Sequence, residues 1–242
     1  MKRRATPDWL TRWEYAHRGL HGAGVPENSL AAAEAAMAAG LGIECDIQRS
    51  ADGHALVFHD WELERLTTGQ GALDAFRIEE IELLSYRETD HRPARLATLL
   101  GLVAGRVPLL IEIKSRPGYD VERTCEHVAG QLHGYAGDHA VMSFDPVVPV
   151  WMREHAGHVP CGLVMREDAY GYTQTQAERE AAVERAAPDF LAYHIAALPN
   201  PWVAGLRKGG LPILTWTVDT PELRERAQAC ADALVCEADG FA

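Results

Sequence analysis

The chain has 242 residues, of which 47% are hydrophobic, so it is long enough to bury a sizeable core without covalent cross-links. Its 23 lysines and arginines and 35 aspartates and glutamates give a formal net charge of −12. An acidic surface argues against nucleic acid as a partner, because nucleic-acid phosphates bind basic surfaces, and it argues equally against electrostatic binding to anionic membranes.

The N-terminal sequence MKRRATPDWLTRWE is basic but has no apolar stretch, so it does not predict a secretory signal. No window approaches the roughly 20 apolar residues of a membrane span. The five cysteines are odd in number, scattered and without a C-x-x-C pair, which favours free thiols in a reducing compartment. We therefore predict a cytoplasmic protein without stable membrane insertion, and its oligomeric state is left open by the sequence.

Eight short apolar runs predict β-strands buried on both faces, as the strands of a parallel barrel are. In chain order these runs are Tyr15–His17, Ile43–Ile47, Leu109–Ile113, Ala140–Phe144, Gly162–Met165, Phe190–Tyr193, Ile213–Val218 and Ala233–Cys236.

Helix signals separate the strands. Asn28 or Ser29 caps an alanine-rich helix that stops at Gly40, and Asp120 begins a helix that ends near Gly134. Three further helices are predicted where a capping residue precedes proline, at Asp145-Pro146, Asn200-Pro201 and Thr220-Pro221. The repeated strand–helix order predicts an α/β fold, a (β/α)8 TIM barrel that takes residues 1–242 as a single domain.

A ninth strand, His54–Phe58, lies only about six residues after Ile47, whereas a parallel crossover needs a dozen or more. A turn at Ala51-Asp52-Gly53 therefore predicts an antiparallel hairpin, which would bring His59 back near Glu44. Residues 61–92 are predicted to form a small insertion of short helices and loops beside this hairpin, at the C-terminal face of the barrel.

Carboxylates stand where two of these strands should end. Glu44 and Asp46 are two residues apart, so both side chains point to one face, and Glu112 and Lys114 repeat that spacing on the next barrel strand. Three converging carboxylates form a hard-oxygen site that suits Mg²⁺ or Ca²⁺. The alternative interpretation is a set of salt-bridged carboxylates without a metal.

Two histidines have matching positions, because His17 ends the first strand and His59 ends the hairpin. Histidine titrates near neutral pH, so the pair can share the roles of general base and general acid. A histidine at a strand end is more often a surface or hydrogen-bonded residue, which is how we interpret most of the others. His194 stays open as a pocket residue, because it follows the sixth barrel strand.

Arg18 and Lys114 suit an anionic substrate, with phosphate as the first candidate. A small-molecule phosphodiester is therefore the expected partner. The alternative is that both side chains only balance the charges of the neighbouring carboxylates.

Several segments resemble the glycerophosphodiester phosphodiesterase family, and together they run from about residue 15 to the end of the chain. They are AHRG at 16–19, PENS at 26–29, IECDIQRSADGHALVFHD at 43–60, LTTGQG at 66–71, IEIKS at 111–115, TWTVD at 215–219 and ADALVCEAD at 231–239.

The resemblance implies metal-dependent hydrolysis of glycerophosphodiesters to sn-glycerol 3-phosphate and an alcohol. In this family's pattern Glu44, Asp46 and Glu112 match the metal ligands. His17 and His59 match the catalytic pair, with His17 as base and His59 as acid. Trp216 resembles the tryptophan that lies against the glycerol; the alternative is a tryptophan of the core.

Two segments depart from the family pattern. PENS replaces the commoner PENT, and Cys236 and Glu237 stand where the family more often has Thr-Asp followed by Arg-Pro. Two other functions compete with the phosphodiesterase. A phospholipase-D-like lyase acting on lysolipids would want an apolar loop near the site, whereas the 166–178 segment is polar. A catalytically silent binding module would not need every ionisable position.

Overall fold

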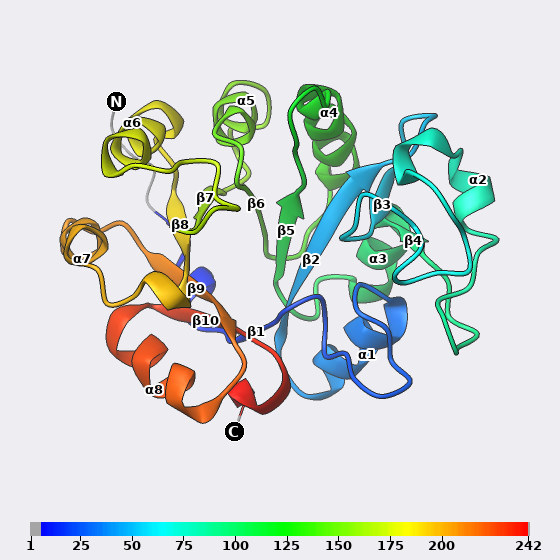
Figure 1. Ribbon diagram of the computed structural model, residues 1–242, viewed down its shortest axis with the longest axis horizontal. Helices are drawn as coiled ribbons and strands as arrows, with labels where there is room; N and C mark the ends of the chain where they lie inside the picture. Colours follow the sequence, from blue (N-terminus) through cyan, green and yellow to red (C-terminus); the bar gives the residue numbers. More distant parts are fainter. Residues whose placement is uncertain (1–5, 242) are drawn as a thin grey trace.

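Eight parallel strands pair in a closed ring in the computed structural model, which describes residues 6–241 (Figure 1). The ring closes because β1 pairs with β2 on one side and with β10 on the other. The strands are β1 (Tyr15–Ala16), β2 (Gly42–Arg49), β5 (Leu109–Ile113), β6 (His139–Ser143), β7 (Cys161–Met165), β8 (Phe190–His194), β9 (Ile213–Val218) and β10 (Ala233–Cys236). The prediction of a (β/α)8 barrel is confirmed.

The strands form where the sequence supplies apolar residues to two cores at once. Side chains of Leu110, Met142, Val164 and Leu214 fill the inside of the barrel, and a short 3₁₀ helix, η1 (Asp8–Thr11), packs Leu10 against them. The alternate residues of the strands pack outward against the helices. Burial on both faces is what produces apolar runs without alternation.

Helices surround the ring (Figure 1). Most of them begin at side chains that bond their first free amide groups, which is how Ser29, Asp120, Asn200 and Thr220 act as N-caps. The helices around the barrel are α1 (Leu30–Ala38), α3 (Leu96–Val103), α4 (Val121–Leu132), α5 (Val147–His155), α6 (Gln176–Ala186), α7 (Pro201–Lys208) and α8 (Pro221–Cys230), with 3₁₀ turns η3 (Ile195–Ala197) and η4 (Ala238–Phe241). Within residues 6–241 no helix is both long and apolar enough to cross a membrane.

Strand β2 pairs both within the barrel ring and within the hairpin. The first part of β2 pairs with β1 and β5, and its last residues pair antiparallel with β3 (Ala55–Val57), as the hairpin prediction required. A further strand, β4 (Ala94–Arg95), extends this side sheet and was not predicted. Phe58 donates its backbone N–H to the carbonyl of Asp46, so the hairpin brings His59 back to the part of β2 that carries Glu44 and Asp46, as predicted.

The insertion after the hairpin has a core of its own. It contains η2 (Leu73–Ala75) and α2 (Ile78–Ile81), and its buried residues are Leu56, Phe58, Leu63, Leu73, Ile78, Ile81 and Tyr86. Tyr86 reaches back to donate a hydrogen bond of 3.4 Å to the carbonyl of Asn28, which ties the insertion to the segment before α1. Figure 1 shows the insertion in cyan at the side of the barrel, next to β2 and β3.

Candidate active site

A cavity of about 240 Å³ lies at the C-terminal ends of the barrel strands. All eight residues that the sequence singled out line it, together with four apolar side chains and Arg166. They are His17, Arg18, Glu44, Asp46, His59, Glu112, Lys114 and Trp216. This is the face of a TIM barrel on which active sites are found, because the βα loops converge there.

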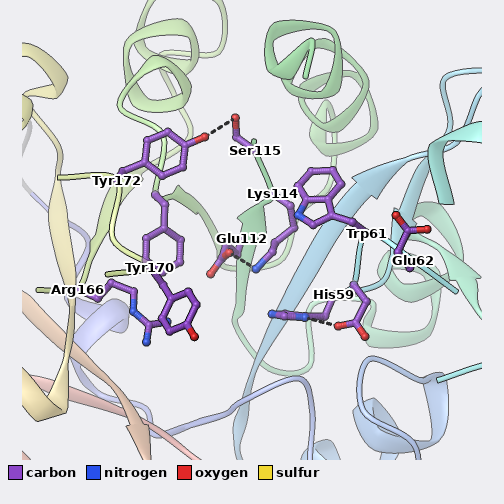
Figure 2. A pocket seen from close by; sticks show the side chains of 11 residues that line it. His59, Trp61, Glu62, Glu112, Lys114, Ser115, Arg166, Tyr170 and Tyr172 are labelled. Atoms are coloured by element: carbon purple, nitrogen blue, oxygen red, sulfur yellow. Dashed lines mark hydrogen bonds and ion pairs between the residues drawn. The ribbon is translucent and has the colours of Figure 1, made fainter. Parts of the chain in front are cut away.

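A second, wider cavity of about 580 Å³ continues from the first toward the surface. The two cavities share His59, Glu112, Lys114, Phe144 and Arg166. Figure 2 shows this outer cavity with Glu112 and Lys114 at its base, Tyr170 and Tyr172 on one side and Trp61 on the other. The site therefore has a smaller, more enclosed inner part and a larger, more open outer part.

The three carboxylates converge because β2 and β5 are neighbours in a fixed register. Asp46 lies beside Glu112 across the two strands, and Glu44 lies two residues earlier on the same face. Each carboxylate offers an oxygen within 4.8 Å of the oxygens of the other two. Their relative exposures are only 2%, 2% and 7%, so the cluster lies in surroundings where unbalanced charge is costly.

The charges of this cluster are incompletely balanced. Burial, together with the charges of Asp46 and Glu112, raises the pKa of Glu44 well above its usual range. Burial also opposes ionisation of Asp46, but Lys114 and His59 outweigh it and hold the pKa of Asp46 below its usual range. A divalent cation among the three groups would let all of them ionise together, and the all-oxygen donor set suits Mg²⁺ or Ca²⁺.

Two basic side chains contact these carboxylates. Lys114 Nζ lies 2.8 Å from Glu112 Oε1 and 3.3 Å from Asp46 Oδ1, and these carboxylates raise the lysine pKa against the effect of burial. Arg18 Nε lies 3.3 Å from Asp46 Oδ2, while its backbone N–H donates to Glu44 at 3.0 Å. Arg18 also bonds Glu27 at 2.7 Å, so two cations face four carboxylates.

Each of the two histidines meets a carboxylate at its Nδ1 atom. His17 Nδ1 lies 2.8 Å from Glu237 Oε2, and His59 Nδ1 lies 2.7 Å from Asp60 Oδ1. A carboxylate at Nδ1 favours the tautomer that carries its proton there, which leaves Nε2 as the nitrogen that can exchange a proton with a substrate. The contacts with His17 and the nearby His21 hold the pKa of Glu237 well below its usual range.

Arg65 connects the hairpin with the segment before α1. Its guanidinium contacts both oxygens of Asp60 and both oxygens of Glu27. The bonds to Glu27 Oε1 and Oε2 measure 2.8 Å and 2.9 Å. Burial opposes ionisation of Asp60, yet the bonds from Arg65 and His59 lower its pKa. Glu27, His59 and Asp60 also lie close enough to hold a metal ion, but Arg65 already bridges the two carboxylates of that group.

Two amides hold this site together, and sequence reasoning did not assign them. Asn28 donates to Asp46 Oδ2 at 2.8 Å and accepts from the Asp46 backbone N–H at 3.0 Å, while Ser29 caps the helix. Gln48 is fully buried, and it donates to the carbonyls of His59 and Asp60 at 2.8 Å and 2.6 Å. The PENS segment was the signal for Asn28; Gln48 carried none beyond being polar in a buried strand.

The opposite wall is aromatic. Trp216 donates from Nε1 to the carbonyl of Ala192 at 3.0 Å and meets Phe144 edge to face, with ring centroids 5.4 Å apart. His194 packs on Trp216 with centroids 4.7 Å apart, and it is not among the residues that line either cavity. Arg166 lines both cavities and ion-pairs with Asp168, although sequence reasoning passed over it.

Comparison with known proteins identifies the family. The model of the glycerophosphoryl diester phosphodiesterase family matches residues 17–237, which is most of the chain. The chain belongs to this family. The prediction from the sequence segments is thereby confirmed, and so is the prediction that the protein is a phosphodiesterase.

Other members resemble this phosphodiesterase over nearly their whole length. A glycerophosphodiester phosphodiesterase of Caldanaerobacter subterraneus subsp. tengcongensis is 30% identical over 237 residues, which cover 92% of each chain. Among solved structures, an Oleispira antarctica phosphodiesterase in complex with the product sn-glycerol-3-phosphate has a TM-score of 0.81 at 21% identity, with 93% of this chain and 92% of that one covered.

A glycerophosphodiester phosphodiesterase from Thermotoga maritima has a TM-score of 0.75 at 24% identity, and 92% of each chain is covered. At such identities these two structures are similar to this phosphodiesterase in fold. The barrel and its alternating helices are thus common to the group.

Proposed function

We propose that this enzyme uses a divalent metal ion, Mg²⁺ or Ca²⁺, to hydrolyse glycerophosphodiesters to sn-glycerol 3-phosphate and an alcohol. The observation that carries the proposal is one enclosed cavity that three carboxylates, two histidines and two basic side chains all line. The solved Oleispira antarctica relative, which holds sn-glycerol-3-phosphate, supports the choice of product.

Glu44, Asp46 and Glu112 are the proposed metal ligands. When bound, the ion would polarise the phosphoryl oxygens and offset the charge that develops on them. The buried cluster supports this assignment, because burial and the neighbouring carboxylates raise the pKa of Glu44, and a divalent cation would offset that repulsion.

Arg18 and Lys114 are proposed to bind the phosphodiester. Both line the inner cavity, and each already holds a carboxylate of the cluster. Charge-assisted hydrogen bonds of this kind are among the stronger polar contacts in proteins. Trp216 is proposed to lie against the glycerol, which the edge-to-face contact with Phe144 supports by fixing the plane of its indole ring.

His17 is proposed as the general base and His59 as the general acid. His17 lines only the inner cavity, whereas His59 lines both cavities. The inner cavity suits the small glycerol phosphate, so the leaving alcohol extends into the outer cavity, on the side of His59. The attacking oxygen is that of water, which gives sn-glycerol 3-phosphate directly, or that of the substrate's own glycerol hydroxyl, which gives a cyclic phosphate that water must then open. Either attacker needs a base to remove its proton.

A lyase that acts on lysolipids is the second candidate. One observation favours it, since Tyr170 and Tyr172 at the outer cavity are 83% and 43% exposed and give its mouth an aromatic side. The enclosed inner cavity fits a small polar group and supports the first proposal instead.

One assay tests these proposals together. The purified protein is incubated with a panel of glycerophosphodiesters and lysolipids, and both the released alcohol and free sn-glycerol 3-phosphate are measured. We expect release from the glycerophosphodiesters, loss of release with EDTA and recovery when Mg²⁺ or Ca²⁺ is restored. Turnover of lysolipids alone would favour the lyase, and full activity in EDTA would refute the metal proposal.

We also propose a cytoplasmic location. All five cysteines have free thiols, and four of them are buried in the barrel and its helices. Such thiols support a reducing compartment. Fractionation of the cells that make the protein tests this location.

A further inference from the structure

The segment after β10 departs from the usual pattern of the family, and the structure brings it to the active site. Glu237 directly follows the last barrel strand, and its backbone N–H donates to Val218 of the neighbouring strand. The backbone N–H of His17 in turn donates to the carbonyl of Cys236 at 2.9 Å. The ring closure of the barrel therefore fixes His17 and Glu237 side by side through their main chains.

The side chains of the two residues make a short contact. His17 Nδ1 and Glu237 Oε2 are 2.8 Å apart, and the side chains are 14% and 30% exposed. His21 Nε2 lies 3.4 Å from the same carboxylate oxygen. Within residues 6–241, no lysine or arginine forms an ion pair with Glu237, so no fixed cation in that part of the chain offsets its charge.

We propose that Glu237 is a positioning residue for His17. Its carboxylate holds the imidazole with Nδ1 protonated and Nε2 toward the inner cavity, and its charge stabilises the imidazolium that forms when Nε2 accepts a proton. Carboxylates do the same for histidine bases elsewhere, where they orient the ring without themselves taking the proton. This inference rests on the proposed function, in which His17 is the base.

Variants of Glu237 test the proposal. Glu237→Gln keeps the size of the side chain but removes its charge, and its amide can donate to Nδ1 and so favour the wrong tautomer. We expect kcat to fall by about 100-fold, the lower end of what a general base contributes, with KM little changed. Glu237→Asp keeps the charge and should recover most of the lost kcat. Because the attacker must be activated whatever the leaving group is, kcat should fall by the same factor with the alkyl diester and with the p-nitrophenyl diester.

Glu14 provides a matched control. It precedes β1 and pairs with Arg224 at 2.6 Å, and neither residue lines either cavity. Glu14→Gln should lower the melting temperature and leave kcat unchanged, whereas Glu237→Gln should lower kcat and leave the melting temperature unchanged. Glu237→Gln that changes only the melting temperature would show a merely structural role and overturn the proposal.

A spectroscopic measurement separates this inference from the proposed function. Nitrogen NMR of the histidine rings reports which nitrogen of His17 carries the proton, whether or not a substrate is turned over. We expect Nδ1 protonation in the natural protein and a changed spectrum in Glu237→Gln. An unchanged His17 spectrum would overturn the positioning role even if the enzyme is active, and inactivity on every diester with the expected spectrum would refute the proposed function alone.

Discussion

The two histidines of the site have the same kind of partner in different electrostatic surroundings. His59 meets Asp60, its neighbour in the chain, and both oxygens of Asp60 are also bound by Arg65. His17 meets Glu237, which is 220 positions away in the chain, and the other close contact of that carboxylate is with His21. Within residues 6–241, a permanent cation thus balances the carboxylate of Asp60 but not that of Glu237.

This difference favours different roles. A carboxylate already paired with arginine still orients a histidine, but less of its charge acts on the ring. In the part of the chain that the structure describes, the carboxylate beside His17 has no arginine or lysine partner, so more of its charge acts on that ring. The comparison supports His17 as base and His59 as acid independently of the cavities that they line.

Disrupting the carboxylate cluster of Glu44, Asp46 and Glu112 should cause the largest loss of activity. Glu112→Ala takes away one of the three proposed ligands, and we expect a loss of about a thousandfold or more on any substrate, because metal catalysis is worth several kcal/mol. Calorimetry should show much weaker Mg²⁺ or Ca²⁺ binding, with circular dichroism unchanged. Unchanged affinity would show that Glu112 is not a ligand of the metal.

The histidine variants test the comparison directly. A general acid matters most when the leaving alcohol is poor, whereas p-nitrophenolate departs as a stable anion. His59→Ala should therefore lose about 100-fold to 10,000-fold on an alkyl diester and much less on a p-nitrophenyl analogue. His17→Ala should lose similar amounts on both, since the attacker must be activated in either case.

The result can also break the comparison. A reversed pattern would exchange the two roles, and the different surroundings of Asp60 and Glu237 would then need another explanation. Modest and equal losses in both variants on both substrates would refute acid–base catalysis by this pair.

Lys114→Met should have a smaller effect, of about 100-fold, comparable to the loss of one donor that stabilises developing negative charge. Lys114 contacts the cluster from the side shared by both cavities, so the loss should fall equally on the alkyl and p-nitrophenyl substrates. Metal affinity should persist, as calorimetry can measure. If kcat/KM stays near that of the natural protein, Lys114 only balances charge.

Arg65→Gln should have the smallest effect and the most selective one. Arg65 is half exposed, and its removal should loosen Asp60 and so misplace His59, for a loss of about tenfold with the alkyl diester and less with the p-nitrophenyl analogue. Arg92→Gln, another exposed arginine of the insertion, is the control and should leave both rates unchanged. Equal losses on both substrates would show that Arg65 does not act through the acid.

The sequence predicted the barrel well where burial on two faces produced apolar runs. The eight barrel strands and the hairpin all occur, with ends that differ by up to two residues. β4 was missed because two residues make no pattern, and α3 because Arg95 at its N-cap offers no side-chain capping bond. An element has no local pattern or cap to predict it from when the residues that stabilise it come from elsewhere in the chain.

The site was predictable for residues that are chemically out of place in a buried strand, such as Glu44 and Asp46. Residues that act through a distant partner were not. Asn28, Arg65 and Glu237 are ordinary polar residues in loops, and the role of each in the site depends on a contact that forms only on folding. His194 was predicted to follow its strand but is the last residue of β8, and its ring contacts Trp216, a detail of packing that no spacing reveals.

The closing contact of the barrel has a consequence for the order in which the enzyme acquires activity. His17 and Glu237 are 220 positions apart, so nearly the whole chain must be synthesised before they can meet. The His59–Asp60 pair and the hairpin can form from local sequence much earlier, because short loops close faster than long ones. We therefore expect recovery of full turnover during refolding to follow the docking of β10 against β1, which completes the surroundings of the proposed base, His17.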